Sequence, residues 1–124
     1  MKQLDYTVYP SNKKTIAVED DQDYGGAHKY SLTNSTGFSN GEAQYVESTQ
    51  SIQFVQKNLD GSMIPGLQSE QLAYVLLDRC IKLNNRFPSE QNKEMIRGLE
   101  IFIKACKDRV EERISRGVMG NLTK

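Results

Sequence analysis

The second half of the chain carries hydrophobic residues at the three-to-four-residue spacing of amphipathic helices. From Ser69, the expected N-cap, to about Arg86, they form a wide stripe: Leu72, Ala73, Val75, Leu76, Leu77, Cys80, Ile81 and Leu83. This width predicts a mostly buried helix. Pro88 ends it, and Ser89 is the expected N-cap of a second helix, with Glu90 in its first turn. Gly117 is expected to end the second helix, whose stripe is narrower: Ile96, Leu99, Ile103, Cys106, Val110 and Ile114.

The short loop between these helices predicts an antiparallel helical hairpin. At 1.5 Å per residue the helices are about 27 and about 42 Å long, so about 15 Å of the second extends past the first, from near Asp108. Val110 and Ile114 continue the apolar stripe through this overhang. Either the rest of the same chain or another subunit must cover them, and the unchanged period favours a subunit. We therefore expect a symmetric homo-oligomer, a dimer or larger.

The first half has the alternation and the turn residues of short strands. Strands are expected over residues 6–9, 15–18, 28–33, 44–47 and 51–57, and the last is the clearest because Ile52 and Phe54 alternate with polar residues. Turns or loops are expected at residues 10–14, around Gly37 and Gly41, and over residues 58–66. The two halves together predict an α+β fold. It has an N-terminal antiparallel β-layer (residues 1–66), followed by an αα-hairpin with a long C-terminal helix (residues 67–124).

The composition fits a single domain: the chain has 124 residues, of which 37% are hydrophobic. Its 16 basic and 16 acidic residues cancel, which argues against binding to a DNA or RNA polymer. No stretch approaches the roughly 18–20 apolar residues that cross a bilayer, and the N-terminus lacks the apolar segment of a signal peptide. Cys80 and Cys106 lie on apolar stripes, so we expect buried thiols in a reducing cytoplasm.

The charges are unevenly distributed. Residues 1–62 hold five Lys and no Arg against eight acidic residues, a net charge of −3, and residues 63–124 hold all six Arg and a net charge of +3. In the second helix a strip beside the apolar stripe follows spacings of three and four: Gly98, Phe102, Ala105, Arg109, Arg113 and Arg116. Small residues, an aromatic ring and forked cations suit a nucleotide with its base and phosphates. Surface ion pairs explain the arginines equally well, because Glu112 is spaced to reach both Arg109 and Arg116.

The turn between the helices is the second candidate site. Phe87 stands beside Pro88 where a polar loop is expected. It either staples the turn to the next helix or stacks on a base, while Asn92 and the amides of the helix N-terminus donate hydrogen bonds to ligand oxygens. In one chain this turn lies far from Arg109 and Arg113, but in an antiparallel dimer the turn of one subunit meets the overhang of the other. A weaker set near Gly25 and Gly26 comprises Tyr24 and His28, and an ordinary turn explains those glycines as well.

Catalytic and metal-binding patterns are missing. His28 is the single histidine, and the chain has no nucleophile elbow, phosphate-binding loop, dinucleotide fingerprint or zinc-type Cys/His spacing. The acidic run at residues 19–23 lacks the spacing of a calcium loop and is better explained as a solvated turn. We therefore expect neither an enzyme nor a bound metal or cofactor.

Four segments resemble small proteins of phages and prophages, the Thoeris anti-defence "sponge" family. They are IQFVQK (residues 52–57), IPGLQSEQL (64–72), RFPSEQN (86–92) and RISRGVMG (113–120), and the likeness covers roughly residues 27–120. The resemblance implies an α+β protein that traps, without cleaving it, the cyclic ADP-ribose isomer (glycocyclic ADP-ribose) made by bacterial TIR-domain defence enzymes. It also implies ligand held between subunits in the cytoplasm of the infected host, and in some members capture of cyclic oligonucleotides.

The resemblance supplies the ligand, and the residue analysis supplies the expected contacts. These are Phe87, Asn92, Arg109 and Arg113, with Arg86, Arg116 and His28 behind them. Two alternatives stay open. One is a phage protein–protein interaction or morphogenesis factor that acts through its β-layer and binds no nucleotide, and the other is a hydrolase that degrades the signal.

Overall fold

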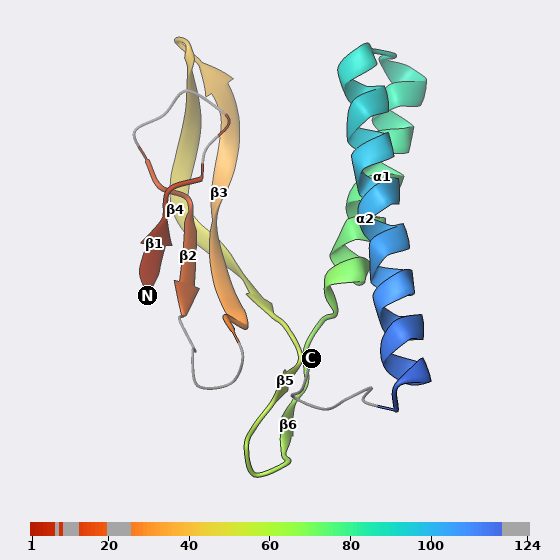
Figure 1. Ribbon diagram of the computed structural model, residues 1–124. Helices are drawn as coiled ribbons and strands as arrows, with labels where there is room; N and C mark the ends of the chain where they lie inside the picture. Colours follow the sequence, from red (N-terminus) through yellow and green to blue (C-terminus); the bar gives the residue numbers. More distant parts are fainter. Residues whose placement is uncertain (7, 9–12, 20–25, 118–124) are drawn as a thin grey trace. The chain divides into compact units, whose positions relative to one another are not determined.

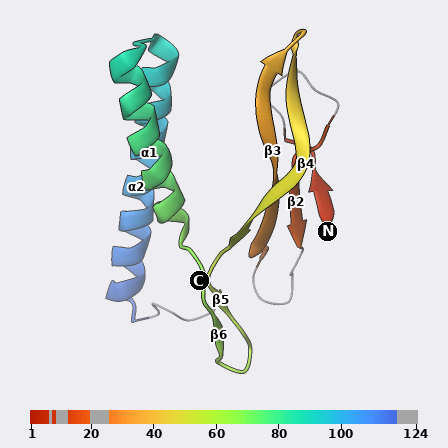
Figure 2. The same ribbon diagram turned by 180° about the vertical axis from the view of Figure 1, so that it is seen from behind.

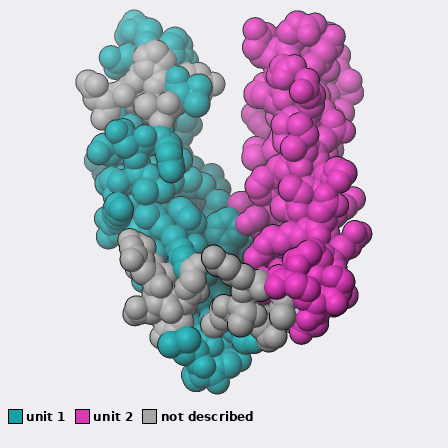
Figure 3. Space-filling view, viewed as in Figure 1, with its two compact units in different colours: residues 1–67 teal, residues 68–124 magenta. Residues whose placement is uncertain are grey.

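The computed structural model describes residues 1–6, 8, 13–19 and 26–117, and these form two compact units, residues 1–67 and residues 68–124 (Figure 3). The first unit is an antiparallel sheet and the second a pair of helices, the last of them long. This α+β fold confirms the predicted fold class. The expectation of a single domain stays a prediction.

The sheet of the first unit contains four antiparallel strands in the order β1-β2-β3-β4 (Figure 1). Their bounds are Lys2–Leu4 (β1), Ile16–Glu19 (β2), Lys29–Ser39 (β3) and Glu42–Gln53 (β4). The small core comprises Ala17, Val18 and Ala43, which are buried, and an edge-to-face pair of Tyr30 and Phe54 whose ring centroids are 5.8 Å apart. The expected strand at residues 6–9 is wrong at Tyr6 and Val8, which lie outside the strands, and residues 7 and 9 are outside the described residues. The first strand, β1, comes earlier in the chain.

Strands β3 and β4 form a hairpin much longer than predicted. The expected loop around Gly37 and Gly41 is confirmed at Gly41 and wrong at Gly37, because Gly37 belongs to β3 and lies at a register shift with φ of 131°. The turn consists of Asn40 and Gly41, whose φ angles of 53° and 78° match the two positive values of a type I′ hairpin turn. A polar ladder holds the hairpin: the Asn34 amide donates to Ser48 Oγ (2.9 Å) and accepts from the Gln50 amide (2.8 Å).

The expected strand over residues 51–57 is interrupted. β4 ends at Gln53, and after a break the chain forms β5 (Gln56–Lys57), which pairs with β6 (Met63–Ile64). The expected loop over residues 58–66 therefore contains a strand. The break is fixed by two backbone hydrogen bonds, from Leu67 N–H to Gln53 O (2.8 Å) and from Val55 N–H to Leu67 O (2.9 Å).

The second unit is the predicted antiparallel helical hairpin, and α1 and α2 lie side by side in both ribbon views (Figures 1 and 2). α1 spans Ser69–Arg86 and α2 spans Glu90–Ser115. The prediction of Ser69 as N-cap is wrong by one residue: Gln68 is the N-cap, and its N–H donates to Gln71 Oε1 at 2.8 Å. Ser89 is the N-cap of α2 as predicted, and Gly117, with φ of 71°, follows the helix end.

The helices meet along a narrow seam. The least exposed positions recur at alternating steps of three and four, Ala73, Leu77 and Cys80 in α1 and Leu99, Ile103, Cys106 and Val110 in α2. Ala73 and Ile103 are buried and both cysteines are half-buried free thiols. The expectation that α1 is mostly buried is wrong in this chain, because one neighbouring helix covers only one stripe and leaves Val75, Leu76, Ile81 and Leu83 exposed.

Candidate functional site

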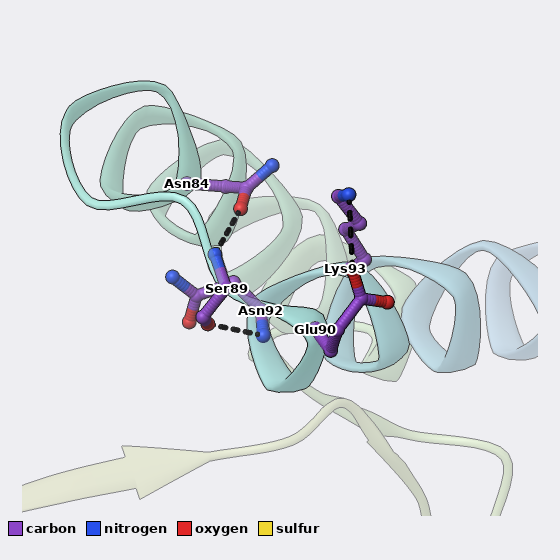
Figure 4. A network of polar contacts seen from close by, with 5 residues as sticks. All are labelled: Asn84, Ser89, Glu90, Asn92 and Lys93. Carbon is purple, nitrogen blue, oxygen red and sulfur yellow. Dashed lines mark hydrogen bonds and ion pairs between the residues drawn. The ribbon is translucent and has the colours of Figure 1, made fainter.

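The turn between the helices holds two predicted contact residues in one hydrogen-bonded structure. Ser89 N–H donates to Asn84 Oδ1 (3.2 Å), and Asn92 N–H donates to Ser89 Oγ (3.0 Å) (Figure 4). The Asn92 side-chain amide donates to the carbonyl oxygen of Phe87 at 2.9 Å. The backbone N–H and one side-chain N–H of Asn92 therefore hold the turn in place, and fewer donors face a ligand than the sequence suggests.

Phe87 is 63% exposed, so it does not staple the turn to the first turn of α2. The Arg86 guanidinium carbon lies 5.3 Å from the centroid of its ring. A guanidinium over an aromatic face is a cation–π contact, and the opposite face of the ring stays available for stacking. The turn thus presents an aromatic ring and a cation together, as a phosphate-bearing aromatic ligand requires.

The three arginines near the end of α2 differ in environment. Arg109 is exposed, Arg113 is only 6% exposed, and Arg116 is exposed and ion-paired with Glu112 (3.1 Å between Nη2 and Oε2). Within the part of the chain that is described, Glu112 pairs with Arg116 and not with Arg109. Arg113 lies three residues beyond Val110, on the same stripe of α2, and its side chain is buried. A ligand therefore meets Arg109 more readily than Arg113.

An exposed apolar surface lies beside the seam, and we call it the outer face. It consists of Leu76 and Phe102, which immediately precede the seam residues Leu77 and Ile103, and of Leu83 and Met95, which lie seven residues from them on the same sides of their helices. In an antiparallel helix pair these positions lie on the same side. Arg109 and Arg116 follow Phe102 at steps of seven, so they extend the outer face along α2. Gly98 lies within it, and a Cβ there would meet no atom within 4 Å.

The two halves of the predicted site are far apart in one chain. Asn92 and Arg109 are separated by 17 residues of the same helix, which is about 25 Å. That is longer than the reach of a single nucleotide-sized molecule. One copy of the chain therefore does not bring the turn and the arginines together on one ligand.

His28 lies in the other unit, where it lines a polar cavity of about 270 Å³. Glu19, Lys29 and Gln53 line the same cavity, and they occupy paired positions across β2, β3 and β4. Sequence reasoning missed Gln53 and Gln56, because only the strand register brings them to His28. Tyr24 and Gly25, expected beside His28, lie outside the described residues.

No protein-family model matches the chain, and no curated protein matches it. Among the described residues there is no group of three or more His, Cys, Asp or Glu side chains arranged to hold a metal ion. The acidic residues 20, 21 and 23 are outside that part of the chain. None of the described helices is long and apolar enough to cross a membrane.

Proposed function

We propose that the protein binds a cyclic ADP-ribose isomer and sequesters it without cleaving it, as an anti-defence protein of a phage or prophage that silences Thoeris-type signalling in the host cytoplasm. The ligand is taken from the resemblance to the Thoeris anti-defence sponge family. The groups at the two ends of α2 support this ligand: the turn with the exposed Phe87 ring lies at the start of the helix, and the arginines lie near its end, about 25 Å away. A pyrophosphate needs the cations, and a base needs the ring.

A homodimer joins the two halves. A two-fold axis perpendicular to α2 between residues 100 and 101 places the turn of one copy beside Arg109 of its partner. The α2 part of the outer face, from Met95 to Phe102, is centred within one helical turn of that axis. Exposed apolar residues of this kind are typical of subunit interfaces. The dimer then has two equivalent sites, each with Phe87 and Asn92 from one copy and Arg109 and Arg113 from the other, flanked by Arg86 and Arg116.

His28 is not part of this composite site in the proposal, since its cavity lies within the first unit. Capture of cyclic oligonucleotides, which the resemblance also implies, is a second ligand class to include in any screen. In the proposal the turn and the arginines hold the ligand as hydrogen-bond donors and cations.

The decisive experiment incubates purified protein with glycocyclic ADP-ribose, removes free ligand, heat-denatures the protein and analyses the supernatant by mass spectrometry. Near-stoichiometric recovery of the intact molecule supports sequestration. A changed product would show a hydrolase instead. No depletion, with the oligomer intact, would favour the interaction or morphogenesis factor that binds no nucleotide.

A second experiment tests the composite site. Phe87→Ala and Arg109→Ala copies, each with its own tag, are co-expressed and their heterodimers purified. If each site takes its turn and its arginine from different copies, one of the two sites in the heterodimer is fully native and the other is doubly impaired. Titration should then show one site of native affinity per dimer. Two equally weakened sites would contradict the composite arrangement.

A further inference from the structure

The polar cavity of the first unit lies at one end of the four-stranded sheet. Glu19 of β2, Lys29 of β3 and Gln53 of β4 form one row across the strands, because Glu19 pairs with Lys29 and Lys29 pairs with Gln53. Residues directly opposite each other on paired strands share a face of the sheet, with their Cβ atoms about 4.5–5.5 Å apart. Gln56 of β5 and Ile64 of β6, which pair with each other, add a second side to the lining. Strand pairing therefore builds this cavity of about 270 Å³.

Two opposite charges line the cavity without neutralising each other. Glu19 and Lys29 are direct neighbours across β2 and β3, yet within the described part of the chain neither side chain makes an ion pair or a hydrogen bond. Gln53 adds a hydrogen-bond acceptor beside them. Its side-chain N–H donates to Phe54 O at 2.7 Å, which leaves Oε1 to accept from a ligand. The row thus presents a carboxylate, an ammonium and an amide oxygen to the same space.

We propose that this cavity binds a free α-amino acid. The ammonium of the ligand lies against Glu19 and its carboxylate against Lys29, so that one small molecule neutralises both charges. Gln53 Oε1 accepts a hydrogen bond from the same ammonium, and Ile64 offers an apolar contact to the ligand's side chain. A simple anion or a simple amine compensates only one of the two charges, which favours the zwitterion. The site lies within the first unit and does not depend on the ligand proposed for the helices.

The single histidine of the chain gives a direct test. His28 lines the cavity, so its ring signals in a proton–carbon NMR spectrum report on this site. The purified full chain is titrated at constant pH with each of the common free amino acids in turn. Binding predicts a saturable shift of the His28 signals with a Kd in the millimolar range, because both charged side chains are exposed. No shift with any amino acid would overturn the proposal.

The charges are then removed one at a time from the ligand and from the protein. For the amino acid that binds most tightly, the N-acetyl derivative lacks the ammonium and the carboxamide derivative lacks the carboxylate. Each should bind the parental chain about fivefold more weakly than the free amino acid. Glu19→Gln should abolish the preference over the N-acetyl derivative and keep the preference over the carboxamide, and Lys29→Gln should do the reverse. Equal binding of all three molecules to the parental chain would contradict the assigned contacts.

Two controls separate these contacts from an effect of net charge. Lys2→Gln in β1 and Glu42→Gln in β4 remove the same charges at strand positions outside the cavity lining. Both variants should bind every probe like the parental chain. If they weaken binding as much as the cavity variants, net charge explains the result and the proposal fails. A shift with acetate as large as that with the free amino acid would assign the cavity to a simple anion and overturn the proposal as well.

Discussion

Among the described glycines, Gly66 is the one at which an added methyl group would collide with backbone atoms. A Cβ built there would lie 2.4 Å from the carbonyl carbon of Phe54, 2.6 Å from Gln53 O and 2.6 Å from Val55 N. All three atoms are backbone, so no side chain can rotate away. Gly66→Ala therefore forces apart the two segments that the Leu67–Gln53 and Val55–Leu67 hydrogen bonds join.

The loss of stability caused by Gly66→Ala can be estimated from the backbone that the new methyl group displaces. Overpacking in a well-packed region costs about 1–3 kcal/mol, and weakening two backbone hydrogen bonds costs about 1 kcal/mol each. These costs overlap, because the same displacement relieves the clash and breaks the bonds. We expect Gly66→Ala to lower the free energy of unfolding of the first unit by about 2–3 kcal/mol.

Urea denaturation measures this effect. Near-UV circular dichroism reports the first unit, since five of the six tyrosines precede residue 67, and ellipticity at 222 nm reports the helices. Gly98→Ala is the matched control because it adds the same methyl group to the other unit, in α2, so the near-UV transition of the first unit should stay unchanged. If Gly66→Ala leaves the near-UV transition of the first unit unchanged, the contact reasoning is refuted.

Four further predictions follow from the helices and one turn. Arg109→Ala should weaken ligand binding by about 1.5–3 kcal/mol by calorimetry, whereas Arg97→Ala, which breaks only a 3.7 Å surface pair with Glu94, should not. Phe102→Asp should give monomers in sedimentation velocity, and a dimer at the parental concentration would exclude the outer face. Ser89→Ala should cost about 1 kcal/mol of helix stability, but Ser69→Ala almost nothing because it is not the N-cap. The Ser62 hydroxyl and N–H donate hydrogen bonds to the Asp60 carboxylate and hold its pKa below the ordinary value. These hydrogen bonds therefore stabilise the fold above the pKa of Asp60 in the unfolded chain, and this stabilisation is lost as the pH falls through the lowered pKa of the folded chain. Ser62→Ala should return the pKa of Asp60 toward its ordinary value in a carbon-13 NMR titration.

The helices could be predicted from the sequence because their ends carry local signals. Ser89 caps α2 through its own side chain, and Gly117 ends it through a backbone angle that glycine adopts easily. The long hairpin of β3 and β4 could not be predicted in the same way, because many of its residues are Ser, Thr, Asn and Gln. Their side chains form hydrogen bonds from one strand to the other, so the strands lack the hydrophobic alternation that marks a strand in sequence. Gly37 looks like a loop residue in sequence but lies at a bulge, where pairing with β4 overrides local preference.

The sequence predicts which types of residue form the candidate site, but it does not predict how they are arranged in space. The spacing of three and four placed Phe102 and Arg109 on one strip, but it also placed Arg113 there, and the structure buries Arg113 and leaves Arg109 exposed. The orientation of Asn92 depends on a carbonyl five residues earlier, and no periodic pattern contains that information. The cavity beside His28 depends on strand register, which pairs Glu19 with Lys29 and Lys29 with Gln53.

The helical unit explains why association and binding belong together in the proposed function. Two helices can bury only the stripes that face each other, and in this unit Ala73 and Ile103 are the described apolar residues that are buried. Apolar side chains remain on both sides of the seam, Leu76, Leu83 and Phe102 on one and Tyr74 on the other. In the proposed dimer, burying the outer face would supply the free energy for dimerisation, and the same step would bring the aromatic turn to the arginines. A trap built in this way has a complete site only as a dimer, so a substitution at Phe102 should abolish binding without touching any group that contacts the ligand.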